Sequence, residues 1–381
     1  MTASTATHAP LLETYARTDV TFVGGEGSWL VDDDGRRYLD FVGGIAVVGL
    51  GHLHPAPLAA AHAQLDRLWH VSNLYWSEPM AQLAELLSQR FGGAGASAFF
   101  CNSGAETIEA ALKFARKATG KTRIVALENS FHGRTMGSLS VTGQPAKRTA
   151  FEPLVPGVVF ASLNDSGSLA ELVDDETACI LVEPVQGEGG IHPARGEFLA
   201  RARELADRHG ALLVFDEVQT GVGRTGTFFA WEALGVKPDA VTLAKGLANG
   251  LPIGALLVAD EIAGAFEPGD HASTFGGNPV SCAAACAVVE TVDDELLANV
   301  RRHGERLTRE LERLPSTVEV RGAGLLLGLE IDHIARDVIA ACLERGLLVG
   351  SAGERVVRIA PPLTVSDDEL DQALAILQEV A

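Results

Sequence analysis

After about residue 50, most of the chain shows two repeating patterns of apolar and polar positions. Short apolar runs predict strands, and longer segments with apolar residues at helical spacing predict helices. The predicted strands are 98–100, 123–127, 158–161, 178–182, 211–215, 240–244 and 254–258, and the predicted helices are 56–69, 78–91, 104–119, 196–209 and 278–291. Because strands that alternate with helices form mostly parallel sheets, this stretch predicts an α/β domain.

The pattern changes near both ends of the chain. After about residue 280, charged amphipathic helices are expected at 293–314, 334–345 and 366–380, around short strands near 317–320, 325–331 and 356–359. Near the start, 28–31 and 37–41 flank the turn Asp32-Asp33-Asp34-Gly35, which predicts a hairpin. We therefore expect an arm and hairpin over 1–45 that belong to a small domain, a large domain over 46–279 built on a mostly parallel seven-stranded sheet, and a smaller α+β domain over 280–381.

Composition narrows the classes of partner. The 381 residues carry a formal net charge of −20, which disfavours nucleic acid and anionic membranes because both would repel the chain. No run of 18 apolar residues predicts a membrane span, and residues 1–10 lack the features of a signal peptide. The five cysteines show neither paired spacing nor a zinc pattern, so we expect no metal and a reduced, cytoplasmic protein.

The segment Asn102-Ser103-Gly104-Ala105-Glu106 lies between a predicted strand and a predicted helix. Ser103 and Glu106 have the spacing of a capping box, which alone explains the segment. The free N–H groups of Gly104 and Ala105, with the Ser103 hydroxyl, can also hold a phosphate at the positive end of the helix. Both interpretations stay open from the residues alone.

Two charged residues stand at the ends of apolar strands. Asp216 follows the strand 211–215, and its burial requires a positive partner, either an arginine or a cationic ring nitrogen. Lys245 follows the strand 240–244, where burial can lower its pKa and make it a nucleophile. The other lysines lie on a helix surface or in polar loops. A purely structural role of Lys245 is the alternative.

One glycine-rich segment, 221–226, matches the GxGxxG pattern of dinucleotide sites. Such a site needs the pattern directly after a strand and at the start of a helix. Here residues 216–220 intervene, and Thr227-Phe228-Phe229 follows. A glycine-rich loop is therefore favoured over a nicotinamide site.

A phosphate cradle, a carboxylate for a ring nitrogen and a nucleophilic lysine are together what pyridoxal phosphate requires. With these motifs the sequence resembles the class-III aminotransferases of fold type I, whose architecture is that of aspartate aminotransferase, and within them the acetylornithine aminotransferases. The resemblance runs from about Tyr15 to the C-terminus. It rests on segments 27–32, 43–47, 51–55, 102–106, 131–135, 183–188, 215–219, 244–246, 273–279 and 358–362.

The resemblance implies a role for each residue at a matching position. Lys245 would carry the cofactor and move the proton, Asp216 would pair with the ring nitrogen, and Gln219 would bind the ring hydroxyl. Phe131 would stack on the ring, with a core aromatic as the alternative. The remaining cofactor contacts implied are Ser103, Gly104, Ala105, Glu217, Val218 and, from the second subunit of a homodimer, Thr274.

The resemblance also implies the substrates and their contacts. Arg134 and Ser273 would hold the carboxylate of N2-acetyl-L-ornithine, and Arg358 would bind the α-carboxylate of 2-oxoglutarate or L-glutamate, because the guanidinium fork fits a carboxylate. Glu188 would neutralise Arg358 in one half-reaction and leave it in the other; a loop salt bridge is the alternative.

Three other amine donors stay open, namely ornithine, succinyl-diaminopimelate and γ-aminobutyrate. Ile45 and the preceding Gly43-Gly44 resemble the acetylornithine group, whereas Tyr15 keeps ornithine open. A non-catalytic metabolite-binding module is disfavoured by the presence of both Lys245 and Asp216.

Overall fold

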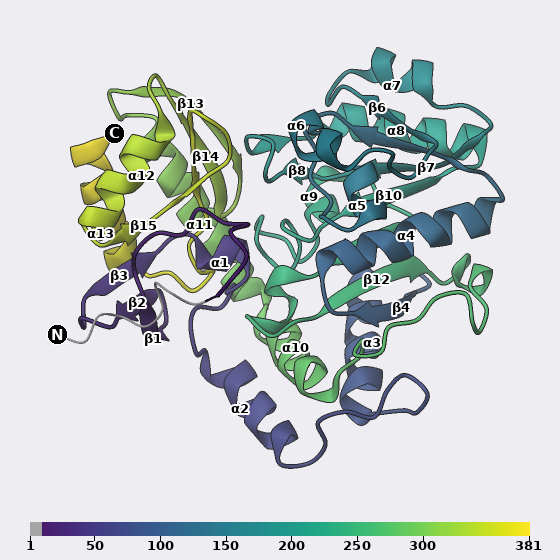
Figure 1. The fold of residues 1–381 in the computed structure, drawn as a ribbon, viewed down its shortest axis with the longest axis horizontal. Coiled ribbons are helices and arrows are strands. Elements are labelled where there is room, and N and C mark those ends of the chain that lie inside the picture. The colour runs from purple at the N-terminus through teal and green to yellow at the C-terminus, as the bar shows by residue number, and fades with distance from the viewer. Residues whose placement is uncertain (1–9) are drawn as a thin grey trace.

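A computed structural model describes residues 10–381. Residues 1–9, which include most of the segment considered as a signal peptide, lie outside the described residues. Figure 1 shows two bodies side by side, one built on a large sheet and one that combines both ends of the chain. Among the described residues, no helix is both long enough and apolar enough to cross a membrane.

The larger body is built on a seven-stranded sheet with the order β4-β12-β11-β10-β7-β5-β6. Only β12 runs antiparallel to its neighbours in this sheet, so the predicted mostly parallel sheet is confirmed. The strands are β4 (Ala96–Cys101), β5 (Arg123–Leu127), β6 (Val158–Ala161), β7 (Thr177–Val182), β10 (Leu212–Asp216), β11 (Ala240–Leu243) and β12 (Gly254–Ala259).

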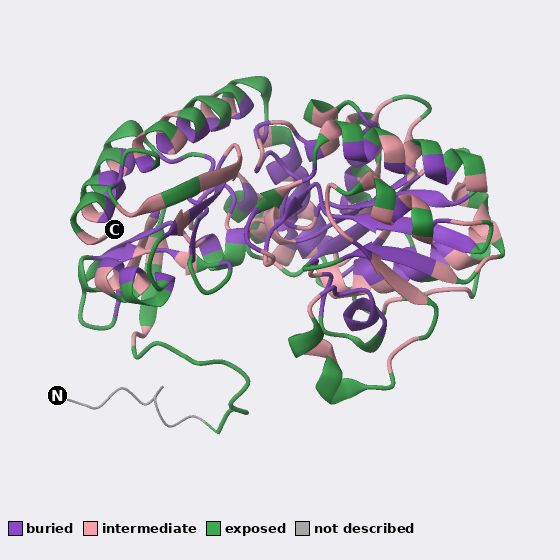
Figure 2. Ribbon diagram, turned by 90° about the horizontal axis from the view of Figure 1, so that it is seen from above, coloured by how far each residue is buried: buried purple, intermediate pink, exposed green. Residues whose placement is uncertain are grey.

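Helices cover both faces of this sheet, because successive residues of each strand are apolar. Leu213 and Phe215 of β10 belong to one core with α3 and α8, whereas Val214 belongs to a second core with α4. Figure 2 shows the strands buried between helices whose outer sides are exposed. The helices of this body are α2 (Pro55–Leu65), α3 (Glu78–Phe91), α4 (Gly104–Thr119), α5 (Met136–Ser140), α6 (Pro145–Arg148), α7 (Ser166–Leu172), α8 (Gly196–His209), α9 (Ala230–Leu234) and α10 (Pro279–Thr291).

Short elements complete the larger body. They are the 3-10 turns η2 (Thr149–Phe151), η3 (Lys245–Ala248) and η4 (Ala263–Ala265), and the two-stranded ribbon of β8 (Val185–Gln186) and β9 (His192–Pro193). Turn η3 and the β8–β9 ribbon border the carboxyl edge of the large sheet, where they supply loop residues of the site.

The smaller body joins both ends of the chain around one core. Leu39 and Phe41 pack with residues of the C-terminal helices and strands, and β15 pairs in parallel with β3. Its N-terminal elements are β1 (Phe22–Glu26), β2 (Trp29–Asp32), β3 (Arg37–Asp40) and α1 (Gly43–Ala46); its C-terminal elements are α11 (Asp294–Leu311), β13 (Thr317–Ala323), β14 (Leu326–Ile331), α12 (Ala335–Glu344), β15 (Leu347–Leu348), β16 (Gly350–Ser351), β17 (Val356–Ile359) and α13 (Asp367–Val380). The predicted hairpin is present as β2 and β3, and β1 adds a strand that the pattern did not predict.

Helix α10 shifts the boundary between the two bodies. It packs against α2 and α3, and Cys282, Val288 and Val292 belong to the same core as α3. We therefore propose that the large domain extends to about Val292, beyond the expected boundary between 279 and 280.

The parallel strands bring several chain segments to one edge of the large sheet. Strands β5, β7, β10 and β11 are parallel to one another, and β4 runs in the same direction because both β4 and β11 are antiparallel to β12. The loops that follow these strands therefore meet at the same edge, where ligand sites of such sheets are found.

Candidate active site

A cavity of about 300 Å³ opens at the carboxyl edge of the large sheet. Most of the residues predicted for cofactor binding line it. They are Ser103, Gly104, Ala105, Phe131, Asp216, Val218, Gln219 and Lys245, together with the predicted substrate residue Glu188.

Helix α4 presents its N-terminus to this cavity. Ser103 is the N-cap, and its Oγ accepts a hydrogen bond of 3.3 Å from the Glu106 N–H. The Glu106 carboxylate accepts from the Asn102 N–H at 2.8 Å, one residue earlier than the predicted capping box requires. The first-turn N–H groups of Gly104 and Ala105 have no intrahelical acceptor, so capping leaves them available to an anion in the cavity.

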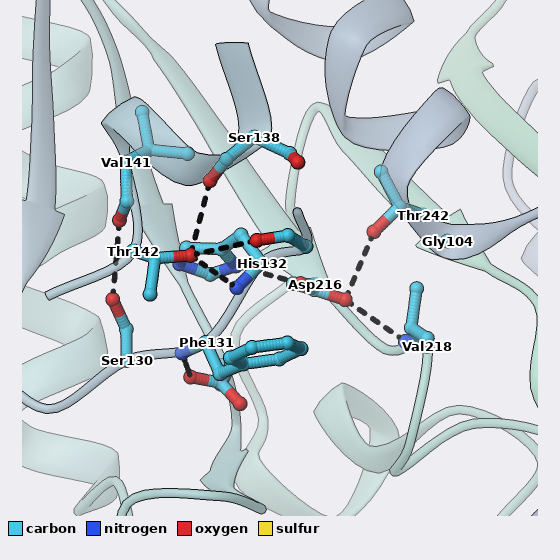
Figure 3. A network of polar contacts seen from close by, with 12 residues as sticks. Gly104, Ser130, Phe131, His132, Ser138, Val141, Thr142, Asp216, Val218 and Thr242 are labelled. Atoms are coloured by element: carbon cyan, nitrogen blue, oxygen red, sulfur yellow. Dashed lines mark hydrogen bonds and ion pairs between the residues drawn. The ribbon is translucent and has the colours of Figure 1, made fainter. Parts of the chain in front are cut away.

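Asp216 lies at the end of β10 with its carboxylate almost fully buried. Oδ1 accepts hydrogen bonds from the Val218 N–H at 3.0 Å and from the Thr242 hydroxyl at 3.1 Å, as Figure 3 shows. Oδ2 accepts from His132 Nδ1 at 2.6 Å. Thr242 reaches Asp216 because the two residues are paired in the register of β10 and β11. These contacts fix the carboxylate at the wall of the cavity.

His132 is the buried partner of Asp216, and it also lines the cavity. Burial disfavours its charged form, but the hydrogen bond and charge of Asp216 outweigh burial and raise the pKa of His132. Thr142 accepts a 3.0 Å hydrogen bond from the His132 backbone N–H and thereby holds the turn that carries the ring. His132 therefore supports the negative charge of Asp216.

Glu183 lies after β7 and supports the loop under Phe131. Its carboxylate accepts from the Phe131 N–H at 2.9 Å and from the Gly187 N–H at 3.2 Å. Burial raises the pKa of Glu183 to about 7. The motif 183–188 is thus anchored at its first residue, while its last residue faces the cavity.

Lys245 follows β11 and directs its amine into the cavity. Burial lowers the pKa of Lys245 to about 8, with the charge of Glu188 acting in the opposite direction. The residue has a φ of 40°, a left-handed conformation that is uncommon for lysine. No described residue forms a hydrogen bond or an ion pair with its amine. A lysine in this state is suited to form a covalent bond with an aldehyde.

Glu188 and Arg358 form an ion pair across the two bodies of the molecule. Arg358 lies on β17 of the smaller body and is nearly buried, whereas Glu188 lines the cavity. Burial raises the pKa of Glu188, but the charge and hydrogen bond of Arg358 outweigh burial and lower it. The two residues predicted to act together are therefore in contact.

Glu217 is placed away from the cavity, contrary to the role implied for it as a cofactor contact. Its carboxylate accepts hydrogen bonds from the N–H groups of Ala230 at 2.6 Å and Trp231 at 3.0 Å, at the start of α9. The reason is the alternation of side chains at the end of β10, which directs Asp216 and Glu217 to opposite sides.

Five predicted substrate or partner residues do not line this cavity within the described chain, and one of them, Arg358, contacts the lining residue Glu188. Tyr15 is 73% exposed in the N-terminal arm. Arg134 is exposed, with its Cζ 5.5 Å from the centroid of the Phe131 ring. Ser273 and Thr274 line a separate hollow with Asn73, and Ser273 Oγ accepts from Asn102 Nδ2 at 3.1 Å. Their predicted roles require substrate, or a second subunit, to complete the site.

The residues present fit pyridoxal phosphate. Gln219 Oε1 is buried without a hydrogen-bond partner among the described residues, as expected of a group that awaits a ligand hydroxyl. The available N–H groups of α4, the Asp216 carboxylate and the unpartnered Lys245 amine supply the other contacts that the cofactor needs. Phe131 and Val218 both line the space between these groups.

Fold and site together define an α/β enzyme that uses a covalently held cofactor. The chain matches the family "Aminotransferase class-III" over residues 13–381 and belongs to it. Relatives named acetylornithine aminotransferase include that of Methanopyrus kandleri, 50% identical over 372 residues (97% of this chain, 96% of the relative), and that of Corynebacterium efficiens, 48% identical over 380 residues (97% and 94%).

Solved structures resemble the chain over nearly its full length. N-acetylornithine aminotransferase from Stenotrophomonas maltophilia is 36% identical with a TM-score of 0.84, covering 96% of each chain. An ornithine aminotransferase from Toxoplasma gondii, described with partial occupancy of PLP at its active site, is 32% identical with a TM-score of 0.93, covering 98% of this chain and 92% of that one.

Three residues that hold the site together received no role from the sequence. His132 and Glu183 lie within motifs that were noted, and Thr242 lies within a predicted strand. The available signal was their position near the ends of parallel strands, which places them at the same edge as Asp216. Their hydrogen-bond partners depend on the order of the strands in the sheet, which cannot be deduced from the sequence alone.

The lowered pKa of Lys245 predicts selective reactivity. In cofactor-free protein, acetic anhydride should label Lys245 with a midpoint near pH 8, because its neutral form predominates above its pKa. Lys117, whose pKa is raised by Asp270 and Glu267, should label only at more alkaline pH. Mass spectrometry across a pH series measures both.

Glu188→Gln supplies a control for the direction of this effect. Removal of the negative charge that supports the ammonium form should move the Lys245 midpoint to a lower pH. A Lys245 midpoint as alkaline as that of Lys117 would contradict the electrostatic description of the site.

Proposed function

We propose that this chain transfers the δ-amino group of N2-acetyl-L-ornithine to 2-oxoglutarate, giving N-acetyl-L-glutamate 5-semialdehyde and L-glutamate. The observation that carries the proposal is the identity of 44–50% to acetylornithine aminotransferases over nearly the whole chain. The reaction places the protein in arginine biosynthesis and, with five buried free cysteines, in the cytoplasm.

The cofactor supplies an aldehyde that accepts the amine and a ring that stabilises negative charge on the reacting carbon. Lys245 would hold the aldehyde and would move a proton to and from the substrate carbon. Asp216 would hold a proton on the ring nitrogen, Gln219 would bind the ring hydroxyl, and Phe131 would pack on the ring. The cofactor would also carry the amino group from one substrate to the other, so we expect a ping-pong order.

The N-terminus of α4 would hold the phosphate of the cofactor. The N–H groups of Gly104 and Ala105 and the Ser103 hydroxyl would contribute from one subunit, at the positive end of the helix dipole. Val218 contributes an apolar wall directly beside Gly104, where an added Cβ would lie 2.8 Å from Val218 Cγ1. Thr274 of the partner subunit completes the phosphate site in this proposal.

Glu188 and Arg358 allow one cavity to accept two kinds of substrate. When the amine donor brings no carboxylate to Arg358, Glu188 neutralises the nearly buried guanidinium, whose isolation would be costly. When 2-oxoglutarate brings its α-carboxylate, Glu188 leaves and the substrate takes its place. The ion pair between the two residues is the arrangement required for the first case.

The donor is tested by single-turnover conversion of cofactor-loaded protein with a panel of amines. The compared quantity is the single-turnover rate constant divided by the apparent dissociation constant. This ratio should be highest for N2-acetyl-L-ornithine, above the ratios for ornithine, succinyl-diaminopimelate and γ-aminobutyrate. The measurement is the change in cofactor absorbance on mixing, with Lys245→Ala as the inactive control. A higher value for ornithine would reject the proposed donor while leaving the enzyme class intact.

Glu188→Gln and Arg358→Ala should act in opposite directions on donor preference. With Glu188→Gln, Arg358 stays free, so glutamate should gain relative to acetylornithine by about 1–3 kcal/mol, the scale of a charged hydrogen bond. Arg358→Ala should harm glutamate and largely spare acetylornithine. The measurement is the single-turnover rate with each donor in both variants. If both variants lower the rates with the two donors equally, Glu188 forms only a loop salt bridge.

A homodimer with shared sites is part of the proposal. Leu74 and Trp76, which are 84% and 85% exposed, border the same hollow as Thr274. Large apolar side chains exposed together are typical of an interface, and a two-fold dimer is the commonest closed assembly. A second copy seated here would cover these side chains and bring Thr274 to a neighbouring cavity.

Mixing two inactive variants tests the shared site. Lys245→Ala and Thr274→Ala chains, after subunit exchange, should form mixed dimers that contain one doubly defective site and one intact site. We expect transaminase activity to return in proportion to the fraction of mixed dimers. Mass spectrometry of the intact dimers measures that fraction. If Thr274→Ala alone is impaired and verified exchange restores nothing, each site is built from one chain.

A further inference from the structure

Two cations lie against the Phe131 ring at the edge of the cavity. Lys147 Nζ, at the C-terminal end of the short helix α6, is 4.6 Å from the ring centroid, and Arg134 Cζ is 5.5 Å from it. Phe131 itself lines the cavity together with Glu188. Neither cation has an ion pair or hydrogen bond with any residue between 10 and 381.

Within the described chain, Lys147 lacks the acceptors that the other lysines outside the cavity have. Lys117 pairs with Glu267 and Asp270. The amines of Lys113, Lys121 and Lys237 donate to backbone carbonyl oxygens. Two adjacent cations repel each other unless an anion lies near both.

The surroundings of Lys147 favour such an anion. Lys147 is half-buried, and burial lowers its pKa, with the neighbouring charges of Arg134 and Arg358 acting in the same direction. The charges of Glu188 and Glu183 act in the opposite direction, but Glu188 is bound by Arg358 and Glu183 by backbone N–H groups. A bound anion would offset this repulsion and favour the charged form of Lys147.

We propose that Lys147, together with Arg134, binds the substrate carboxylate that lies farthest from the reacting carbon. Lys147 is thereby a specificity-determining residue for carboxylate-bearing substrates. This inference rests on the proposed function, in which N2-acetyl-L-ornithine, 2-oxoglutarate and glutamate each carry such a carboxylate. Because all of them do, Lys147 assists both half-reactions, unlike Glu188 and Arg358, which distinguish one from the other.

The test compares two donors that differ only in this carboxylate. N2-Acetyl-L-ornithine carries it, and N-acetylputrescine is the same molecule with hydrogen in its place. In single-turnover reactions, Lys147→Met should lower the rate over apparent dissociation constant for acetylornithine about tenfold or more, the scale of a charged hydrogen bond. The same ratio for N-acetylputrescine should change by less than about twofold, because this donor has no carboxylate that Lys147 could bind.

Two further variants show that the effect belongs to this position. Lys147→Arg keeps the charge and should retain most of the preference for acetylornithine. Lys237→Met removes a lysine with a similar aromatic contact, 4.2 Å from the Phe91 ring. Because Phe91, unlike Phe131, does not line the cavity, the rates with both donors should stay unchanged. Comparison of two donors within each variant cancels any difference in the amount of folded protein.

Two outcomes would overturn the inference. Equal losses for acetylornithine and N-acetylputrescine in Lys147→Met would mean that Lys147 acts only through Phe131 or the fold. A change in the reaction rate with glutamate relative to the rate with acetylornithine would mean that Lys147 acts on Glu188 instead. Failure of the proposed function is separate, because it would be visible as poor use of acetylornithine by the unaltered protein.

Discussion

Burial of the Asp216 carboxylate is the constraint on which the rest of the site depends. A buried carboxylate is stable only when donors and positive charge surround it. The Val218 N–H, the Thr242 hydroxyl and His132 Nδ1 satisfy its oxygens, and the pKa of His132 is raised as a result. A carboxylate fixed in this way can hold a proton on a ring nitrogen throughout a reaction, because it cannot turn away toward water.

The sheet brings the other groups to this carboxylate. Since the parallel strands end at one edge, the loop after β5 supplies Phe131 and the loop after β11 supplies Lys245. The smaller body then adds Arg358, whose ion pair with Glu188 joins the two bodies beside the cavity. The large body thus holds the chemistry that both substrates share, and the contact with the smaller body distinguishes between them.

Much of the fold could be predicted because local signals agree with it. The predicted bounds of α3, α4 and α8 match the structure, and each of these helices ends at a glycine C-cap. The predicted bounds of β5, β6 and β17 also match the structure. Strand β1 contains two glycines and is largely exposed, so its sequence carries little apolar pattern. Helix α10 has a strong local pattern, but its place in the large core depends on contacts with α2 and α3.

The candidate site was predictable where one strand end carries one chemical group, as for Asp216 and Lys245. The resemblance implied Glu217 as a cofactor contact without saying where its side chain lies. Its carboxylate accepts from N–H groups at the start of α9, because neighbouring residues at a strand end point to opposite sides. His132 could not be paired with Asp216 from the sequence, because β7 lies between β5 and β10 in the sheet. The substrate residues that lie outside the cavity depend on a ligand or a second subunit.

The most direct test of this account is the rate of the first half-reaction in Asp216→Asn, compared with Asp239→Asn. Asp239 immediately precedes β11, at the opposite edge of the same sheet, where it binds Arg203 and the Leu213 N–H. The account predicts that Asp216→Asn slows the half-reaction at least about tenfold, or 1.4 kcal/mol, while the cofactor stays bound. Asp239→Asn should leave the rate unchanged. A loss smaller than tenfold in folded, cofactor-loaded Asp216→Asn would mean that this carboxylate is only structural, and would contradict the account.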